Sequence, residues 1–158
     1  MAGTKKTPDS PLDASGLRIA IVVATFNEEI TSRLLEGARE CLKKNNVRDD
    51  AITEQRVPGA FELAQAAQVL ARRGDIDAIV ALGCVVRGDT PHFEYVSQAA
   101  TYGLQKVALE TGVPVAFGVL TTDDFAQAEA RAGGEHGNKG FDAAQTAIEM
   151  ALLLRGLG

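Results

Sequence analysis

The stretch LRIAIVVA, residues 17–24, indicates the fold class of this chain. Its apolar residues are rich in β-branched side chains and run without alternation, which is typical of a strand covered on both faces of a sheet. A helical period follows, because Ile30, Leu34, Ala38 and Cys41 recur at three- and four-residue spacing. Together the two patterns predict a buried strand followed by a helix.

The same alternation continues to the end of the chain. It predicts further strands at residues 51–57, 77–86 and 113–120, and further helices at residues 60–74, 91–112, 124–132 and 141–155. Strands that alternate with helices favour a parallel sheet with helices on both faces. We therefore expect an α/β fold, a three-layer α/β/α sandwich around a four-stranded parallel sheet of the flavodoxin-like kind.

Length and composition indicate one domain. A chain of 158 residues with 46% hydrophobic content can bury one core but not two. We expect residues 1–16, which are rich in Pro, Ser and Asp, to be a flexible or partner-bound arm, and residues 17–158 to form a single domain.

Several function classes are excluded by charge and residue usage. The net charge is −5 and the basic residues are scattered, so no nucleic-acid-binding surface is expected. The start lacks an apolar signal region, and no segment is apolar for long enough to cross a bilayer, which predicts a cytoplasmic protein without membrane contact. Cys41 and Cys84 have no Cys or His at ligand spacing, so buried reduced thiols are expected and no metal site.

The last predicted helix is apolar on more than one side. One face carries Ala144, Ile148, Ala151 and Leu152, and a second carries Ala143, Ala147, Met150 and Leu154. Such a helix needs more than one partner to cover it. This predicts an oligomer with the helix in the interface, while a helix wedged deep in its own fold remains an alternative.

The unusual residues follow the predicted strands, where ligands bind in open parallel sheets. They lie in TFNEE (residues 25–29), VPGAFE (57–62), RGDTPH (87–92) and TTDD (121–124). An adhesion role for the RGD tripeptide would need export, which nothing here predicts. Four such segments on one rim predict a binding site.

The segment RGDTPH predicts a helix start. Thr90 fits an N-cap and Pro91 a first helical residue, which leaves the N–H groups of Asp89 and Thr90 free to bind a phosphate. The Asp89 carboxylate should then turn away or hold Arg87. His92 would lie in the first turn, where the helix dipole favours a neutral, proton-accepting ring. Simple capping and a surface histidine remain open alternatives.

Other residues describe the rest of a pocket. Phe26 and Phe61 offer planar rings, and Glu62 can accept hydrogen bonds from hydroxyl groups, although Phe61 could equally be a core residue. Arg131 and Lys139 flank a glycine-rich segment and could hold an anion and a polar heterocycle. The set suits a flat heteroaromatic ring, hydroxyl groups and a phosphate.

These segments resemble the lumazine synthase family of riboflavin biosynthesis. The resemblance rests on ATFNEEIT, VPGAFE, ALGCVVRGDTPHFEYV, PVAFGVLTT and RAGGEHGNKGFDAAQTAIEMA, in the family's order and over about residues 17–155. It implies a transferase with no metal or organic cofactor. The implied reaction condenses 5-amino-6-(D-ribitylamino)uracil with 3,4-dihydroxy-2-butanone 4-phosphate to 6,7-dimethyl-8-ribityllumazine, phosphate and water.

The resemblance also implies a role for each site residue. His92 would shuttle protons, and phosphate would be bound by Asp89, Thr90 and Arg131. The ribitylaminouracil would contact Phe26, Ala60, Phe61, Glu62, Cys84, Val85, Val86, Phe117 and Lys139. In this family Phe117, Arg131 and Lys139 come from the neighbouring subunit.

The resemblance further implies a homo-oligomer. Family members form pentamers, pairs of pentamers or icosahedral shells of sixty subunits, and the short segment from Arg131 to Lys139 favours the shell. The N-terminal segment would add a strand to a neighbouring subunit, and riboflavin synthase is an expected partner. A catalytically silent flavin-binding or shell-forming relative is the alternative, although it would not need His92, Arg131 and Lys139.

Overall fold

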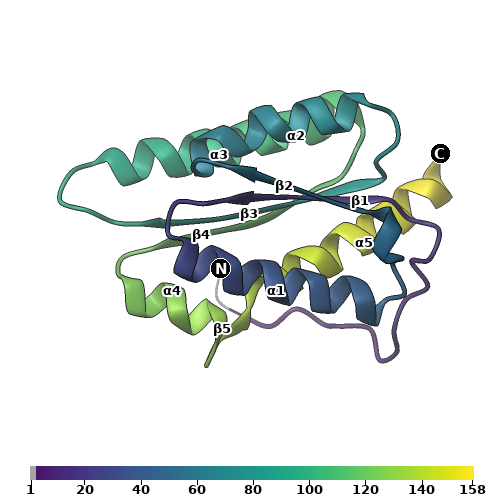
Figure 1. Ribbon diagram of the computed structural model, residues 1–158, viewed down its shortest axis with the longest axis horizontal. Coiled ribbons are helices and arrows are strands. Elements are labelled where there is room, and N and C mark those ends of the chain that lie inside the picture. The colour runs from purple at the N-terminus through teal and green to yellow at the C-terminus, as the bar shows by residue number, and fades with distance from the viewer. Residues whose placement is uncertain (1–2) are drawn as a thin grey trace.

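A computed structural model describes residues 3–158 of the chain. Four parallel strands form one sheet in the order β2-β1-β3-β4: β1 (Ile19–Ala24), β2 (Ile52–Val57), β3 (Ala78–Val86) and β4 (Val115–Thr122). The helices are α1 (Glu28–Lys44), α2 (Leu63–Arg72), α3 (His92–Thr111), α4 (Phe125–Arg131) and α5 (Lys139–Leu157). Figure 1 shows α2 and α3 on one face of the sheet and α1, α4 and α5 on the other. The predicted α/β/α sandwich is confirmed.

The core consists of two apolar layers separated by the sheet. Ile19, Ile21 and Val23 of β1 pack into the layer under α1 and α5. Ala20, Val22 and Ala24 alternate with them and pack into the layer under α2 and α3. Successive side chains of a strand point to opposite faces. A strand buried on both faces therefore needs the continuous apolar run that the sequence shows.

Residues with suitable backbone or side-chain chemistry occupy two of the helix ends. Gly112 follows α3 with φ 74°, a left-handed conformation that glycine adopts without strain. Asn138 caps α5, because its Oδ1 accepts hydrogen bonds from the N–H groups of Gly140 (2.8 Å) and Phe141 (3.2 Å). The glycine-rich segment before α5, expected to be a loop, forms a short hairpin of β5 (Ala132–Gly134) and β6 (Gly137–Asn138). Two short 3₁₀ turns, η1 (Asp49–Ala51) and η2 (Ala60–Glu62), also precede β2 and α2.

Helix α5 corrects one step of the interface prediction. Ala143 and Ala147, expected on a second uncovered face, are 5% and 0% exposed because α5 packs against both the sheet and α1. A single chain therefore offers this helix two partners rather than one. The apolar side chains that α5 leaves partly in solvent are Met150, Leu153, Leu154 and Leu157.

The N-terminal segment follows the α1 and α5 side of the molecule. Ala14 and Leu17 are buried in the core, and the N–H of Leu12 donates to Oδ1 of Asn45 at 2.8 Å. Nearer the start, Lys5 forms an ion pair with Glu149 of α5 at 2.9 Å. Addition of this segment to a neighbouring sheet concerns a second chain and stays a prediction. Among residues 3–158, none of the helices combines the length and apolar character needed to span a membrane.

Candidate active site

The carboxyl ends of the four strands lie along one edge of the sheet, on the left in Figure 1. Backbone hydrogen bonds join the loops at this edge in pairs. The N–H groups of Thr25 and Phe26 donate to the carbonyl oxygens of Val57 (2.8 Å) and Pro58 (2.9 Å), and the N–H of Arg87 donates to Thr122 (2.9 Å). The predicted convergence of the four loops on one rim is therefore present in the structure.

Two phenylalanines present their rings to solvent at this edge. Phe26 follows β1 and is 70% exposed, and Phe61 follows β2 and is 63% exposed. The alternative that Phe61 is a core residue is therefore wrong, because the 3₁₀ turn η2 directs Leu63 inward in its place. Large apolar side chains left in water beside polar loops are a usual feature of binding sites.

The turn η2 holds Ala60 and Glu62 close to β3. Ala60 is buried, and it can approach because Gly83 of β3 has no side chain; a Cβ there would lie 3.5 Å from that of Ala60. The carboxylate of Glu62 folds back toward Gly59, where an added Cβ would meet Oε2 at 3.1 Å. Ala60 thus lies against β3, and the Glu62 carboxylate lies beside the backbone of Gly59.

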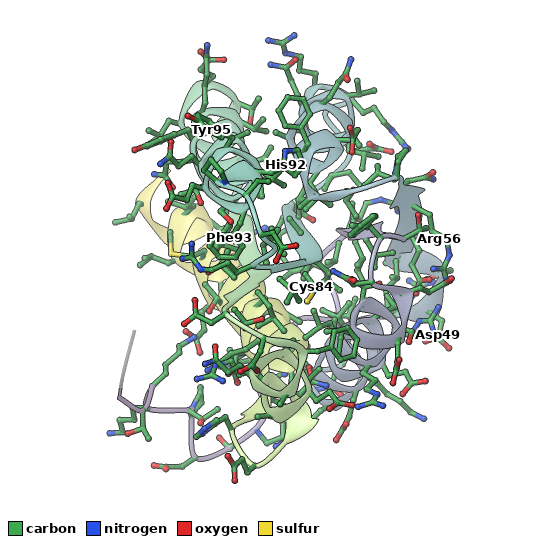
Figure 2. The ribbon with its side chains drawn as sticks, turned by 90° about the vertical axis from the view of Figure 1, so that its left-hand side faces the viewer. Asp49, Arg56, Cys84, His92, Phe93 and Tyr95 are labelled. Carbon is green, nitrogen blue, oxygen red and sulfur yellow. The ribbon has the colours of Figure 1, made fainter. Side chains whose placement is uncertain are left out.

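At the end of β3 the side chains pack into the protein, so a ligand there would meet backbone groups rather than side chains. Cys84 packs into the core below the sheet, and burial raises the pKa of its thiol to about 11, so the thiol stays protonated near neutral pH. Figure 2 looks onto the edge and places Cys84 below His92. Val85 and Val86 are half-buried and pack on opposite faces. Cys41 is also free and buried, which confirms the expectation of two buried thiols.

The loop from Arg87 to Pro91 differs in detail from its prediction. Helix α3 begins at His92 with Pro91 as its cap position, so Thr90 is not the N-cap; its Oγ1 makes only a long 3.5 Å contact with the N–H of His92. Arg87 does not pair with Asp89. It reaches Asp123 (3.0 Å) and Glu94 (3.8 Å) instead, because its backbone bond to Thr122 turns it toward the loop after β4.

The same loop leaves donors unused. No hydrogen bond within residues 3–158 uses the backbone N–H of Gly88, Asp89 or Thr90. These residues are exposed, and Pro91 alone separates them from His92 at the start of a 20-residue helix. Free N–H groups at the positive end of a helix dipole suit a phosphate, and His92 stands next to them.

Three predicted site residues lie elsewhere in the chain. Phe117 pairs with Ala81 in the middle of the edge strand β4, on the α2 and α3 face, and is 46% exposed. Arg131 ends α4 and donates to the carbonyl of Gln127 at 2.9 Å, while Lys139 begins α5 and lies 3.4 Å from Asp142. Within the described part of the chain, no hydrogen bond or ion pair joins these two cations to the carboxyl-edge loops.

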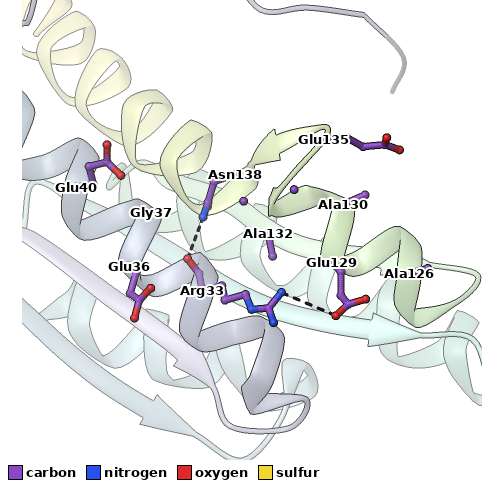
Figure 3. Close-up of a pocket in the computed structure, with 12 residues that line it drawn as sticks. Arg33, Glu36, Gly37, Glu40, Ala126, Glu129, Ala130, Ala132, Glu135 and Asn138 are labelled. Atoms are coloured by element: carbon purple, nitrogen blue, oxygen red, sulfur yellow. Dashed lines mark hydrogen bonds and ion pairs between the residues drawn. The ribbon is translucent and has the colours of Figure 1, made fainter.

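A hollow lined largely by charged side chains lies away from this edge. It has a volume of about 820 Å³ and lies between α1, α4 and the β5–β6 hairpin. Figure 3 shows its charged lining, in which Arg33 lies 3.9 Å from Glu129 and Asn138 donates to the Arg33 carbonyl at 2.9 Å. Glu36, Glu40 and Glu135 add negative charge, and none of the predicted site residues lines it.

Sequence reasoning missed two contacts at the edge. Asn27 adopts a left-handed conformation and donates from its side chain to the carbonyl of Cys84 at 2.9 Å, and Asp123 holds Arg87. An asparagine in a short turn between a strand and a helix is a signal for the first, since asparagine tolerates this conformation. The second has no local signal. Within residues 3–158, no three His, Cys, Asp or Glu side chains are grouped as metal ligands.

Comparison with known proteins covers nearly the whole chain. Residues 16–155 match the family model described as 6,7-dimethyl-8-ribityllumazine synthase. A 6,7-dimethyl-8-ribityllumazine synthase from Chlorobium phaeobacteroides is 50% identical over 150 residues, which cover 95% of this chain and 97% of that protein. The matched region contains all four carboxyl-edge loops and the hairpin between Arg131 and Lys139.

Proposed function

The chain belongs to the 6,7-dimethyl-8-ribityllumazine synthase family, and from that premise we propose how its residues carry out the reaction. It is a transferase that condenses 5-amino-6-(D-ribitylamino)uracil with 3,4-dihydroxy-2-butanone 4-phosphate. The products are 6,7-dimethyl-8-ribityllumazine, phosphate and water. This is the penultimate step of riboflavin biosynthesis.

The chemistry consists of condensations and one elimination. The 5-amino group adds to the ketone and loses water to give an imine. Removal of the proton next to the imine carbon expels phosphate, and the enol that results becomes a ketone. The ribitylamino nitrogen attacks that ketone, and loss of a second water closes the ring. No step changes the net oxidation state, so the proposed mechanism requires no redox cofactor.

Phosphate binding is assigned to the loop before α3 and to one cation. The N–H groups of Asp89 and Thr90, which have no partner within residues 3–158, would hold the phosphate oxygens together with the guanidinium of Arg131. These free N–H groups, directly before His92, are the observation that carries the proposal. His92 would move protons during imine formation and elimination.

The pyrimidine and its ribityl chain are assigned to the other loops. The exposed ring of Phe26 would stack on the pyrimidine, with Phe117 and Lys139 completing its surroundings. Polar contacts to the ring edge and the ribityl hydroxyls would come from Ala60, Phe61, Glu62, Cys84, Val85 and Val86. Most of these contacts hold and orient the two reactants, so positioning would supply much of the rate.

The site is proposed to be shared between subunits of a homopentamer. Within residues 3–158 of one chain, Arg131 and Lys139 make hydrogen bonds and ion pairs only to nearby residues of the same helix, on the opposite side of the sheet from α3. Phe117 lies on the α2 and α3 face, where Val69, Tyr95, Tyr102 and Leu109 are also exposed. In a head-to-tail ring one neighbour would cover the exposed side chains of α2 and α3 and bring its own Phe117, Arg131 and Lys139 to the edge, while Phe117 of this chain would serve the neighbour on the other side.

Further assembly and partners belong to the same proposal. We infer a shell of sixty subunits from the short connection between Arg131 and Lys139, a strand added to a neighbour by the N-terminal segment, and association with riboflavin synthase. The reaction is placed in the cytoplasm, where the buried thiols of Cys41 and Cys84 would stay reduced.

The test is to mix the purified protein with both substrates and follow the fluorescence of the lumazine. We expect formation well above the uncatalysed rate. Formation that does not exceed that rate, from a folded oligomer, would refute the activity. If Arg131→Ala kept full activity at low concentrations of the butanone phosphate, the phosphate assignment would be wrong while the activity itself stood.

A further inference from the structure

We propose that Asn27 is a positioning residue for the pyrimidine-binding half of the site. It would act by holding the turn that carries Phe26 against the end of β3. The proposal rests on the assignment above, in which Phe26 and the backbone from Cys84 to Val86 contact the ribitylaminouracil. Asn27 itself makes no contact with substrate in this scheme.

The backbone of Asn27 is unusual. Its φ of 58° and ψ of 47° lie in the left-handed region, and among residues 3–158 only Asn27 and Asn46 combine a positive φ with a side chain. Asn27 occupies the cap position of α1, yet its side chain makes no capping hydrogen bond. Instead its Nδ2 donates to the carbonyl oxygen of Cys84 at 2.9 Å. The side-chain amide of Asn27 therefore bonds to strand β3 instead of capping helix α1.

The Cys84 carbonyl oxygen is free to accept the Asn27 bond because the pairing of β1 with β3 ends before Cys84. Pairing between β1 and β3 ends at Val23 and Leu82, whereas pairing between β3 and β4 continues to Val86 and Thr122. Cys84 therefore has a strand neighbour on the β4 side only. The side chain of Asn27 supplies a hydrogen-bond donor on the other side of Cys84, where β1 no longer pairs with β3. It thereby adds one hydrogen bond between the end of β3 and the turn that follows β1.

The turn is thereby held from both sides. On the β2 side the N–H groups of Thr25 and Phe26 bond to Val57 and Pro58. On the β3 side, within residues 3–158, the only hydrogen bond from the turn is that of Asn27 to Cys84. Since the Phe26 ring is 70% exposed, packing within the described chain does little to hold it. The distance between the ring and the end of β3 then depends on the Asn27 amide.

The test distinguishes the effect of the Asn27 side-chain amide from the effect of its left-handed backbone conformation. Asn27→Gly keeps a residue that adopts the left-handed conformation without strain, but it removes the donor. In the full-length protein we expect the KM for ribitylaminouracil to rise about tenfold. The KM for the butanone phosphate and kcat should change by less than about twofold, because the phosphate loop is untouched. A purely structural defect would instead lower the active fraction, and so kcat, with both KM values unchanged.

Asn46 provides a matched control. It has a φ of 67° at the other end of α1, and its side chain makes only a long 3.5 Å contact with the carbonyl of Leu12. Asn46→Gly should leave both KM values as they are. Asn27→Asp, which tolerates the same backbone but cannot donate, should raise the KM for ribitylaminouracil at least as much as Asn27→Gly. It keeps the test decisive if the glycine variant fails to assemble.

Unchanged KM values in both Asn27 variants, equal rises for the two substrates, or the same rise in Asn46→Gly would each overturn the proposal. Phe26→Ala tests the assignment of Phe26 separately from the positioning role of Asn27. If Phe26→Ala leaves the KM for ribitylaminouracil unchanged, the assignment of Phe26 is wrong. If Phe26→Ala raises that KM and the Asn27 variants do not, the assignment stands and the positioning role of Asn27 is refuted.

Discussion

Arg87 donates a hydrogen bond from Nε to Oδ1 of Asp123 at 3.0 Å, which joins the loop after β3 to the loop after β4. The same guanidinium lies 4.5 Å from the centre of the Phe93 ring and 3.8 Å from the Glu94 carboxylate. These contacts surround the base of the loop whose free N–H groups precede His92. Because the Arg87 and Asp123 side chains are 45% and 67% exposed, their pairing orders the loop more than it stabilises the fold.

Removing the charge of Asp123 should therefore affect phosphate binding. We expect Asp123→Asn to raise the KM for the butanone phosphate about threefold and to change the free energy of unfolding by less than about 1 kcal/mol. Steady-state kinetics and denaturant titration measure both. Asp50→Asn, which breaks the similarly exposed pair with Arg48 away from the site, is the control. A KM no different from that control would mean that the pair does not order the loop.

His92 and Arg131 should differ in the kinetic constant that they change. Arg131→Ala removes a charge-assisted contact, so we expect the KM for the butanone phosphate to rise about a hundredfold. His92→Ala should mainly lower kcat, by about tenfold, because positioning would still supply much of the rate. Substrate titrations of both variants give these constants. A fall in kcat alone for Arg131→Ala would contradict the phosphate assignment.

A shared site predicts complementation between two defective chains. When His92→Ala and Arg131→Ala chains are dissociated, mixed in equal amounts and reassembled, about a quarter of the sites should combine an intact His92 with an intact Arg131. Activity should then exceed that of either variant reassembled alone. Activity equal to the average of the two would place both residues of each site in one chain.

Gly140 should be intolerant of any side chain. It is the second residue of α5 and packs against α1, where an added Cβ would overlap the carbonyl of Leu34. We expect Gly140→Ala to lower the free energy of unfolding by about 3 kcal/mol or to prevent folding. Gly156→Ala, in the same helix with open space around it, should be neutral or stabilising by up to about 1 kcal/mol. Equal unfolding midpoints for the two variants would show that α1 and α5 do not pack this closely.

The buried thiols should make stability fall at high pH. Burial raises the pKa of Cys84 to about 11 and that of Cys41 to about 12, from an ordinary value of 9.0. Between pH 9 and 11 the unfolded chain would lose thiol protons that the folded chain keeps, so unfolding becomes easier by up to about 1.4 kcal/mol per pH unit for each thiol. Denaturant titrations from pH 8 to 11 should show a shallower decline in Cys84→Ala. Parallel declines would contradict a raised thiol pKa.

Local patterns were sufficient for most of the fold. The period of apolar residues predicted all four sheet strands and the five helices, and Gly112 marked a helix end, because such patterns depend on residues close together in the chain. The hairpin between Ala132 and Asn138 was missed, since its strands are only three and two residues long and consist largely of glycine. We predicted that α3 starts at Pro91, but it starts one residue later, at His92.

The sequence alone predicted which loops would carry the chemistry, because ligand sites in parallel sheets follow the strand ends and each strand could be located from its own residues. It did not establish how the residues of those loops meet. The exposure of Phe61, the pairing of Arg87 with Asp123 across 36 positions and the bond from Asn27 to Cys84 across 57 became visible only in the tertiary structure. The physical reason is that strand order and register, which bring distant loops together, are properties of the assembled sheet and leave no mark in the neighbouring residues.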